Sequence, residues 1–212
     1  MDKNKTAVDL FNKLAKGYQE KYMDVSMYSN SLDVFCQLQK NNAEILELAC
    51  GPGNITNYLL SNRPDLRILG TDLSPNMIDL ATANNPTAEF KVMDSRAISG
   101  ISKKHDAIMC GFFLPYLSKE EVLKLIHDFS AVLKPGGSLN LSTIEDDHSN
   151  SGFRKGSTGE EIYMHYYEAD FLKTALIQNQ FKIELTERIE SKGPEDSTVT
   201  DVIIIALKEH LT

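Results

Sequence analysis

From residue 43 to the C-terminus, short apolar runs alternate with amphipathic segments. Runs such as EILELA and LRILGTDL have the length and composition of buried strands, and the segments between such runs repeat apolar residues at helical spacing. Strands that alternate with helices in this way form parallel sheets covered by helices. The pattern therefore predicts an open α/β fold.

Seven strands are expected in this part of the chain. They lie at 44–49, 66–73, 88–94, 105–113, 138–144, 181–190 and 201–209. The polar stretch between the last two is too short to hold a crossover helix, so this pair should form an antiparallel hairpin. We predict a seven-stranded, mostly parallel sheet with an antiparallel C-terminal hairpin and helices on both faces.

Capping signals mark where two helices of this fold begin. Ser74 is placed as an N-cap, and Pro75 occupies the first turn, where its missing N–H does no harm. Ser118 and Glu121 form a capping box, and KPGG at 134–137 ends the helix that follows it. Another helix is expected over EADFLKTALIQNQ.

The first forty residues read as two helices ahead of the sheet. Val8, Phe11, Ala15 and Tyr18 recur at helical spacing, and SLDVFCQLQK predicts the second helix. We expect one domain over residues 1–212, in which residues 1–42 form a small N-terminal helical cap on a core of residues 43–212.

Composition narrows the class of function and the compartment. The net charge of −8 argues against a broad grip on nucleic acid. No apolar run approaches the roughly 20 residues of a membrane span, and the N-terminus lacks the features of a signal peptide. The three cysteines form no CxxC pair. We expect a cytoplasmic protein that acts on a small molecule, with no membrane and no nucleic-acid partner.

The turn ACGPGNIT follows the first strand of the sheet. Ligands of open α/β sheets bind beyond the carboxyl ends of the strands, and Gly51 and Gly53 allow a ligand to lie against the backbone. A nicotinamide-dinucleotide fingerprint would place a third glycine where this chain has Thr56. This departure weakens the hypothesis of an NAD-dependent oxidoreductase but does not exclude it.

Polar residues also end the second and third strands. Asp72, followed by Leu73, lies about 20 residues after the glycine turn, the offset at which a carboxylate reaches ribose hydroxyls. Asp94 and Ser95 close the third strand, where a polar side chain is placed to bond an adenine edge. The alternative for each is an ordinary turn residue at the end of a strand.

Together these residues resemble the class I S-adenosylmethionine-dependent methyltransferase family. ELACGPGNI is similar to its first motif, with Glu47 at the acidic position, Gly51 and Gly53 at the last two glycines, and Ala49 at the first. The resemblance implies a Rossmann-like fold and S-adenosylmethionine as cofactor. The cofactor-binding residues that it implies are Tyr18, Glu47, Ala49, Gly51, Gly53, Asp72, Leu73, Asp94, Ser95 and Cys110.

The acceptor side of such a site is expected after the fourth strand. In CGFFLPYLS, Phe112, Phe113 and Tyr116 are placed to wall an acceptor pocket, although core packing is the alternative for the phenylalanines. Family members that methylate adenine in nucleic acid carry an Asn/Asp-Pro-Pro-Tyr/Phe stretch here. This chain has FLPY instead, which disfavours base methylation.

The segment 145–167 is polar and contains glycine, which favours a mobile lid. Its acidic residues and His148 are interpreted as a solvated loop, so no metal site is expected. His165 is the candidate general base and substrate contact, because imidazole titrates near neutral pH. A structural histidine is the alternative reading.

These observations favour methyl transfer from S-adenosylmethionine to a small soluble acceptor by in-line displacement. Such a reaction needs a general base only when the acceptor must lose a proton. Two rivals stay open. One is an NAD-dependent oxidoreductase, and the other is a non-catalytic S-adenosylmethionine-binding module that serves as a sensor or partner subunit.

Overall fold

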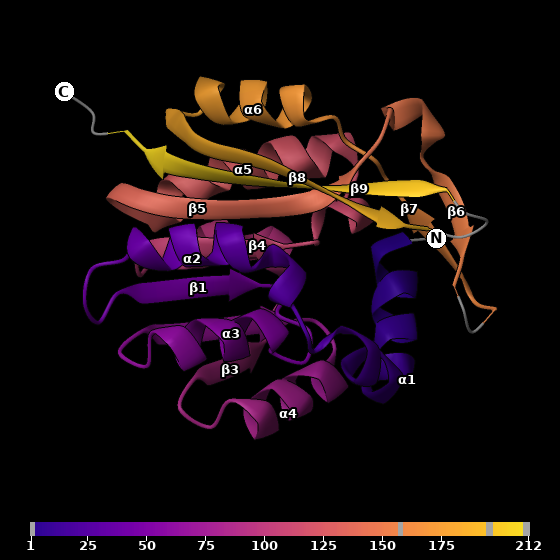
Figure 1. The fold of residues 1–212 in the computed structure, drawn as a ribbon, viewed down its shortest axis with the longest axis horizontal. Coiled ribbons are helices and arrows are strands. Elements are labelled where there is room, and N and C mark those ends of the chain that lie inside the picture. The colour runs from indigo at the N-terminus through magenta and orange to yellow at the C-terminus, as the bar shows by residue number, and fades with distance from the viewer. Residues whose placement is uncertain (1–2, 157–158, 194–196, 210–212) are drawn as a thin grey trace.

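The computed structural model describes residues 3–156, 159–193 and 197–209 (Figure 1). Its main sheet has seven strands in the order β3-β2-β1-β4-β5-β9-β8. The strands are β1 (Glu44–Leu48), β2 (Arg67–Asp72), β3 (Glu89–Val92), β4 (His105–Gly111), β5 (Leu133–Glu145), β8 (Phe181–Lys192) and β9 (Thr198–Lys208).

The strand directions confirm the predicted fold class. Strands β1 to β5 pair in parallel, whereas β9 is antiparallel to both β5 and β8. The C-terminal hairpin thus inserts β9 between β5 and β8. Because the polar connection before β9 is short, the chain must return alongside the strand it has just left.

The described residues form six α-helices, most of which connect or cover these strands. They are α1 (Lys3–Tyr22), α2 (Ser29–Gln37), α3 (Asn54–Asn62), α4 (Pro75–Asn84), α5 (Lys119–Val132) and α6 (Ala169–Gln178). Short 3-10 turns occur at η1 (Ser26–Tyr28), η2 (Ser95–Gly100), η3 (Leu114–Tyr116) and η4 (His148–Asn150). The predicted caps are present: the Ser74 hydroxyl accepts the Met77 N–H, and Ser118 and Glu121 make both bonds of the capping box.

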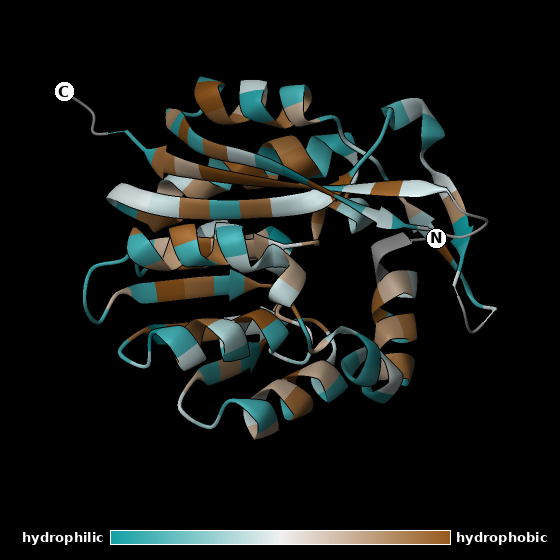
Figure 2. Cartoon of the chain, in the orientation of Figure 1, coloured by the Kyte–Doolittle hydropathy of each residue, from teal (hydrophilic) through white to brown (hydrophobic). Residues whose placement is uncertain are grey.

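The apolar residues divide into two layers, one on each face of the sheet. On β4, Ile108 and Cys110 pack toward α5 and α6, while Ala107 and Met109 pack toward α2 and α3. Side chains alternate between the faces of a strand, so a central strand buried on both sides is apolar throughout. Figure 2 shows α2 and α3 alternating hydrophobic and hydrophilic residues, as helices with one face on a sheet do.

Helix α1 lies at the edge where the parallel strands end (Figure 1). The Asn12 side-chain oxygen accepts hydrogen bonds from the Ser74 hydroxyl (2.8 Å) and the Asn76 N–H (3.0 Å), and the Asn12 carbonyl accepts one from the Asn76 amide. These contacts fasten α1 to the start of α4. They place the N-terminal segment beside the ligand-binding edge of the sheet.

The segment expected as a polar lid contains a two-stranded antiparallel sheet that the sequence reading missed. Its strands are β6 (Gly152–Lys155) and β7 (Glu161–Met164), and residues 157–158 lie outside the described residues. An ion pair of 2.8 Å joins Glu160 to Lys13 of α1. The short strands were missed because four residues are too few to show a clear apolar alternation.

Candidate functional site

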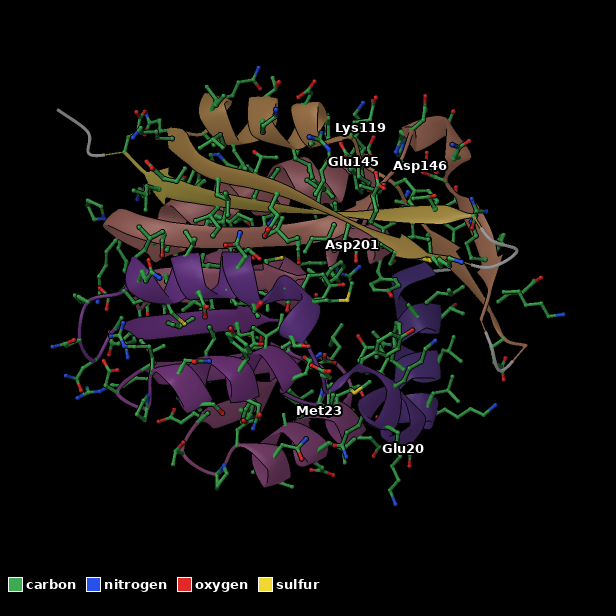
Figure 3. All side chains as sticks on the ribbon, viewed as in Figure 1. Glu20, Met23, Lys119, Glu145, Asp146 and Asp201 are labelled. Carbon is green, nitrogen blue, oxygen red and sulfur yellow. The ribbon has the colours of Figure 1, made fainter. Side chains whose placement is uncertain are left out.

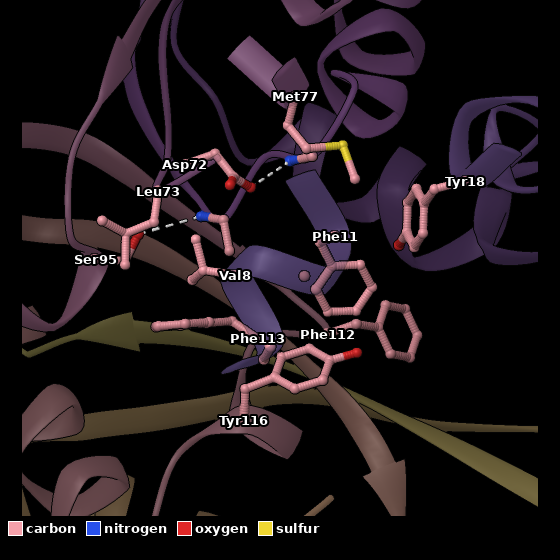
Figure 4. A pocket seen from close by; sticks show the side chains of 14 residues that line it. Val8, Phe11, Tyr18, Asp72, Leu73, Met77, Ser95, Phe112, Phe113 and Tyr116 are labelled. Atoms are coloured by element: carbon pink, nitrogen blue, oxygen red, sulfur yellow. Dashed lines mark hydrogen bonds between the residues drawn. The ribbon is translucent and has the colours of Figure 1, made fainter. Parts of the chain in front are cut away.

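A pocket of about 720 Å³, part of it open to solvent, lies where α1 crosses the carboxyl ends of the strands. Figure 4 shows side chains from α1, β2 and η3 converging on the pocket. The residues that line it are Ala7, Val8, Phe11, Tyr18, Ala49, Gly51, Asp72, Leu73, Met77, Ser95, Gly111, Phe112, Phe113 and Tyr116.

Asp72 is the acidic side chain of this pocket. Its Oδ2 atom accepts the Gly51 N–H at 3.0 Å, and its Oδ1 atom accepts the Ser74 N–H at 2.8 Å (Figure 4 shows the bond to Gly51). Burial raises the pKa of the carboxyl, and these backbone N–H groups oppose the rise. Each oxygen retains a lone pair, so the carboxylate can accept hydroxyl donors from a ligand.

The two glycines of the turn have different roles. Gly51 lines the pocket at φ +53°, and a Cβ atom there would lie 3.8 Å from Tyr18. Gly53 does not line the pocket. At φ +77°, its Cβ would lie 2.4 Å from the Asn85 amide nitrogen and 3.2 Å from Ala81, so this glycine permits the turn to pack against α4.

Ala49 stands where the family motif has its first glycine. Its φ of +50° is in the left-handed region, which a side chain disfavours by roughly 1–2 kcal/mol. The Ala49 N–H donates to the Ser95 hydroxyl at 3.3 Å, as Figure 4 shows. The turn thus keeps the conformation of a glycine at this position although the residue is alanine.

The structure separates the neighbours Asp94 and Ser95. Ser95 lines the pocket and is buried. Asp94 instead caps η2 by accepting the Arg96 N–H and forms a 2.7 Å ion pair with the Arg96 guanidinium. The pKa of Asp94 is lowered: burial alone would raise it, and the bonds from Arg96 outweigh burial. Of this predicted pair, only Ser95 is presented to the pocket.

Glu47 lies beneath the turn and does not line the pocket. Its side chain accepts the hydroxyl of Thr56 in the first turn of α3, and the Thr56 N–H as well. Burial raises its pKa to about 7, against these stabilising bonds. The structure therefore gives Glu47 the position of a support for the turn.

Cys110, which was predicted at the cofactor, does not line the described pocket. Its side chain is fully buried in the layer under α5, where burial raises the pKa of the thiol. Gly111, Phe112 and Phe113 line the pocket at this strand end. The alternation of side chains explains the change, because the residue after a core-facing one points to the other side.

Several residues of α1 line the pocket beside the predicted Tyr18. Phe11 packs edge-to-face on Tyr18 and on Tyr116, with ring centroids 5.7 and 5.2 Å apart, and Val8 completes this wall. Burial raises the pKa of Tyr18 to about 12, so its hydroxyl is protonated at neutral pH. Sequence reasoning had the signal for Val8 and Phe11, since both belong to the same helical stripe as Tyr18.

The predicted acceptor-side residues do not all meet. Phe112, Phe113 and Tyr116 line the pocket, and Met77 of α4, which was not predicted, lines it on the Asp72 side. His165 does not line it. Its backbone N–H donates to the Pro115 carbonyl at 2.8 Å, and its ring lies among those of His148, Tyr163 and Tyr167.

The described part of the chain has no cluster of three or more histidine, cysteine, aspartate or glutamate side chains placed to hold a metal ion. Over the same residues, no helix combines the length and apolar character needed to cross a bilayer.

Comparisons with known proteins agree with this geometry. Residues 45–137 match a family model described as a methyltransferase domain. Putative methyltransferase 235L of Invertebrate iridescent virus 6 is 32% identical over 124 residues, which are 57% of this chain and 46% of that protein. Trans-aconitate 2-methyltransferase of Variovorax paradoxus is 33% identical over 99 residues, which are 47% and 38% of the two chains. The chain thus spans less than half the length of these curated relatives.

A solved structure extends the likeness to the whole fold. Magnesium protoporphyrin IX methyltransferase from Synechocystis PCC 6803, with bound S-adenosylmethionine, matches with a TM-score of 0.72 at 15% identity. The match covers 99% of this chain and 98% of that one. At this identity the likeness concerns the arrangement of strands and helices.

Proposed function

Because the chain belongs to the class I S-adenosylmethionine-dependent methyltransferase family, we propose that its pocket binds S-adenosylmethionine and that it methylates a small soluble acceptor. Residues 1–42 serve as a cap over this pocket, and residues 43–212 form the core. The protein works in the cytoplasm and has no nucleic-acid partner. The net charge of −8 and the three buried free cysteines support these assignments.

The position of Asp72 carries this proposal. The carboxylate is fixed by backbone N–H groups on both oxygens and faces a pocket that also contains the bare backbone of Gly51. A ribose presents two adjacent hydroxyl donors, which match the remaining lone pairs of one carboxylate. The residues present therefore fit the adenosyl group.

The remaining contacts divide along the pocket. Leu73 and Met77 give an apolar lining on the Asp72 side, and Ser95 adds a hydroxyl there for the adenine edge. Ala49 and Gly51 supply the turn over which the cofactor lies. Glu47 acts on the site through Thr56, and Gly53 through its packing on α4.

When bound, S-adenosylmethionine supplies a methyl group on a positively charged sulfur; the acceptor atom forms the new bond to this carbon as the carbon–sulfur bond breaks and its electron pair stays on sulfur, leaving S-adenosylhomocysteine. The chain aligns the acceptor and excludes water. Phe11, Tyr18 and Tyr116 cover the pocket with aromatic rings. Burial raises the pKa of Tyr116 as well as that of Tyr18, so both phenols remain hydrogen-bond donors.

The residues that line the described pocket include no histidine, lysine or arginine. Asp72, their one carboxylate, already accepts two backbone N–H groups. The proposed reaction therefore relies on alignment and desolvation, and an acceptor proton leaves to solvent. The position of His165 outside the lining supports a structural role for it.

Calorimetric titration with S-adenosylmethionine, S-adenosylhomocysteine, NAD and NADH tests the cofactor. We expect saturable binding of the two adenosyl ligands alone, and binding of NAD or NADH alone would overturn the proposal. Incubation with methyl-labelled cofactor and a pool of small metabolites then tests catalysis. A labelled product is expected, whereas binding without any product would indicate a non-catalytic module.

A further inference from the structure

A second, smaller cavity of about 260 Å³, including space open to solvent, lies behind Phe112 on the α2 side of the sheet. Phe112 lines both cavities, so its side chain stands between them. The other residues of the second cavity are Tyr28, Ser31, Leu32, Ile55, Met109, Asn140, Ser142 and Ile203. Its wall is apolar on the side of α3 and β4, and polar groups come from β5.

Asn140 gives this cavity an unsatisfied polar group. The residue is 2% exposed, and its Nδ2 atom has no hydrogen-bond partner among the described residues. Buried amide donors are nearly always paired with protein, water or ligand atoms. The unpaired Asn140 amide therefore indicates that the cavity holds a ligand able to accept a hydrogen bond.

Phe112 is held in an unusual backbone conformation. Its φ of +52° is in the left-handed region, which bulky residues rarely adopt. The Phe112 N–H donates to the Ser142 carbonyl (3.1 Å) and hydroxyl (3.2 Å), and its ring lies 5.2 Å from that of Tyr28. Such conformations persist where the surroundings enforce them, and they cluster at ligand sites.

The charges around the two cavities are negative. The Tyr28 hydroxyl donates to the Asp201 carboxylate at 2.6 Å, and Asp201 lies on β9, on the face of the sheet toward η1 and α2 (Figure 3). Glu187 of β8 pairs with Ile203, a lining residue of the second cavity, and its Oε1 atom accepts the side-chain N–H of Asn30. The described residues that line the two cavities include no lysine, arginine or histidine. A carboxylate guest would thus be buried without a cation to pair with it.

On the premise of the methyl transfer proposed above, we propose that the second cavity is the polar end of the acceptor site, with Phe112 as its movable wall. It takes an uncharged or positively charged hydroxyl or amine compound and rejects carboxylates. Rotation of the Phe112 side chain joins the cavity to the cofactor pocket, and the Asn140 amide bonds the polar group of the acceptor.

Three one-ring probes test this assignment by calorimetry at neutral pH: phenol is neutral, benzylamine is cationic and benzoate is anionic. They are titrated into protein saturated with S-adenosylhomocysteine, as wild type, Phe112→Gly and the double variant Phe112→Gly/Asn140→Leu. Glycine suits the φ of position 112 and removes the ring. Phe153→Gly and Asn62→Leu are matched controls, because both residues are exposed and far from the cavity lining.

We expect phenol and benzylamine to bind with higher affinity than benzoate in every sample. Phe112→Gly should bind phenol at least tenfold more tightly than wild type. Adding Asn140→Leu to this variant should weaken its phenol affinity about tenfold. Equal binding of benzoate, or no effect of Asn140→Leu in a folded variant, overturns the assignment. Asn140→Ala replaces the leucine variant if thermal melting shows that the latter is unfolded.

The same samples separate this inference from the proposed function. Titration with S-adenosylhomocysteine alone reports on the cofactor pocket, and its failure would count against methyl transfer. The three probes without that ligand still report on the cavity. If phenol still binds selectively and its binding depends on Asn140, the cavity is a binding site even when S-adenosylhomocysteine does not bind. Its role as the acceptor site would then be rejected together with the proposed methyl transfer.

Discussion

The hydroxyl of Thr56 donates a hydrogen bond to the buried carboxylate of Glu47 and so joins the first turn of α3 to the middle of β1. Glu47 is 1% exposed, and its carboxylate also accepts the Thr56 N–H. The pair holds the glycine turn from below, between the strand that enters it and the helix that leaves it.

Glu47 should make stability depend on pH. Burial raises its folded pKa to about 7 from an ordinary value of 4.5, so the native state binds a proton more tightly than the unfolded chain. The resulting stabilisation is complete below about pH 4.5 and is lost as pH rises through about 7. Across this window the free energy of unfolding should lose up to about 3 kcal/mol through this group.

Glu47→Gln isolates that effect, because glutamine keeps the shape and has no charge to lose. We compare the free energy of unfolding of both proteins in denaturant at pH 5 and pH 8. Relative to wild type, the variant should be about 2.5 kcal/mol more stable at pH 8 than at pH 5. A difference between the two proteins that does not change with pH would contradict the assigned pKa.

Ala49→Gly should stabilise the protein. Glycine removes the cost of a side chain at φ +50°, which exceeds the entropy that glycine loses on folding, so we expect a gain of about 0.5–1 kcal/mol in denaturant unfolding. Ala83→Gly, on the exposed side of α4, should instead lose about 1 kcal/mol. Gly53→Ala should lose more stability than Ala83→Gly does, since the added Cβ would clash with the Asn85 amide. A loss in Ala49→Gly as large as in Ala83→Gly would rule out strain at Ala49.

Asp72→Ala should weaken S-adenosylhomocysteine binding in calorimetry. Each hydrogen bond from a ribose hydroxyl to the carboxylate contributes about 1.5–3 kcal/mol, so a loss of at least tenfold is expected. Asp79→Ala is the control, because it removes the same charge from an exposed position of α4. Unchanged affinity in a folded Asp72→Ala variant would sink the ribose assignment.

Ser95 and Asp94 should respond differently to substitution. Ser95→Ala removes a hydroxyl that lines the pocket and accepts the Ala49 N–H, so cofactor affinity should fall about three- to tenfold. Asp94→Ala removes the η2 cap and the Arg96 pair, and its main effect should be a lower melting temperature. The reverse order of effects on affinity would show that Asp94 contacts the cofactor.

His165→Ala should leave the pH profile of kcat in its wild-type form. The imidazole lies in an aromatic cluster outside the lining of the described pocket, so we expect it to take no part in proton transfer. Loss of that cluster should lower the melting temperature by a few degrees. If the variant instead loses an ionisation that limits the rate in wild type, His165 is the general base.

Local chemistry made much of the fold readable from the chain. The Ser118–Glu121 box, the Ser74–Pro75 start and the apolar runs set the helices and strands within a few residues, because these signals act over one or two turns. The strands β6 and β7 were not predicted, since a strand of four residues is too short to give a periodic signal. Cys110, predicted at the cofactor, lies in the core under α5 and outside the lining of the described pocket.

The sequence by itself determined the class of fold, the strands of the main sheet and several of the residues at its carboxyl edge, because strand ends and turns are set by neighbouring residues. Only the tertiary structure decided which of these side chains face the pocket. Ser95 faces it and Asp94 does not, because Arg96 holds the aspartate; Gly53 serves α4, because Asn85 and Ala81 lie against it. Such choices depend on packing between segments far apart in the chain, which no local pattern records.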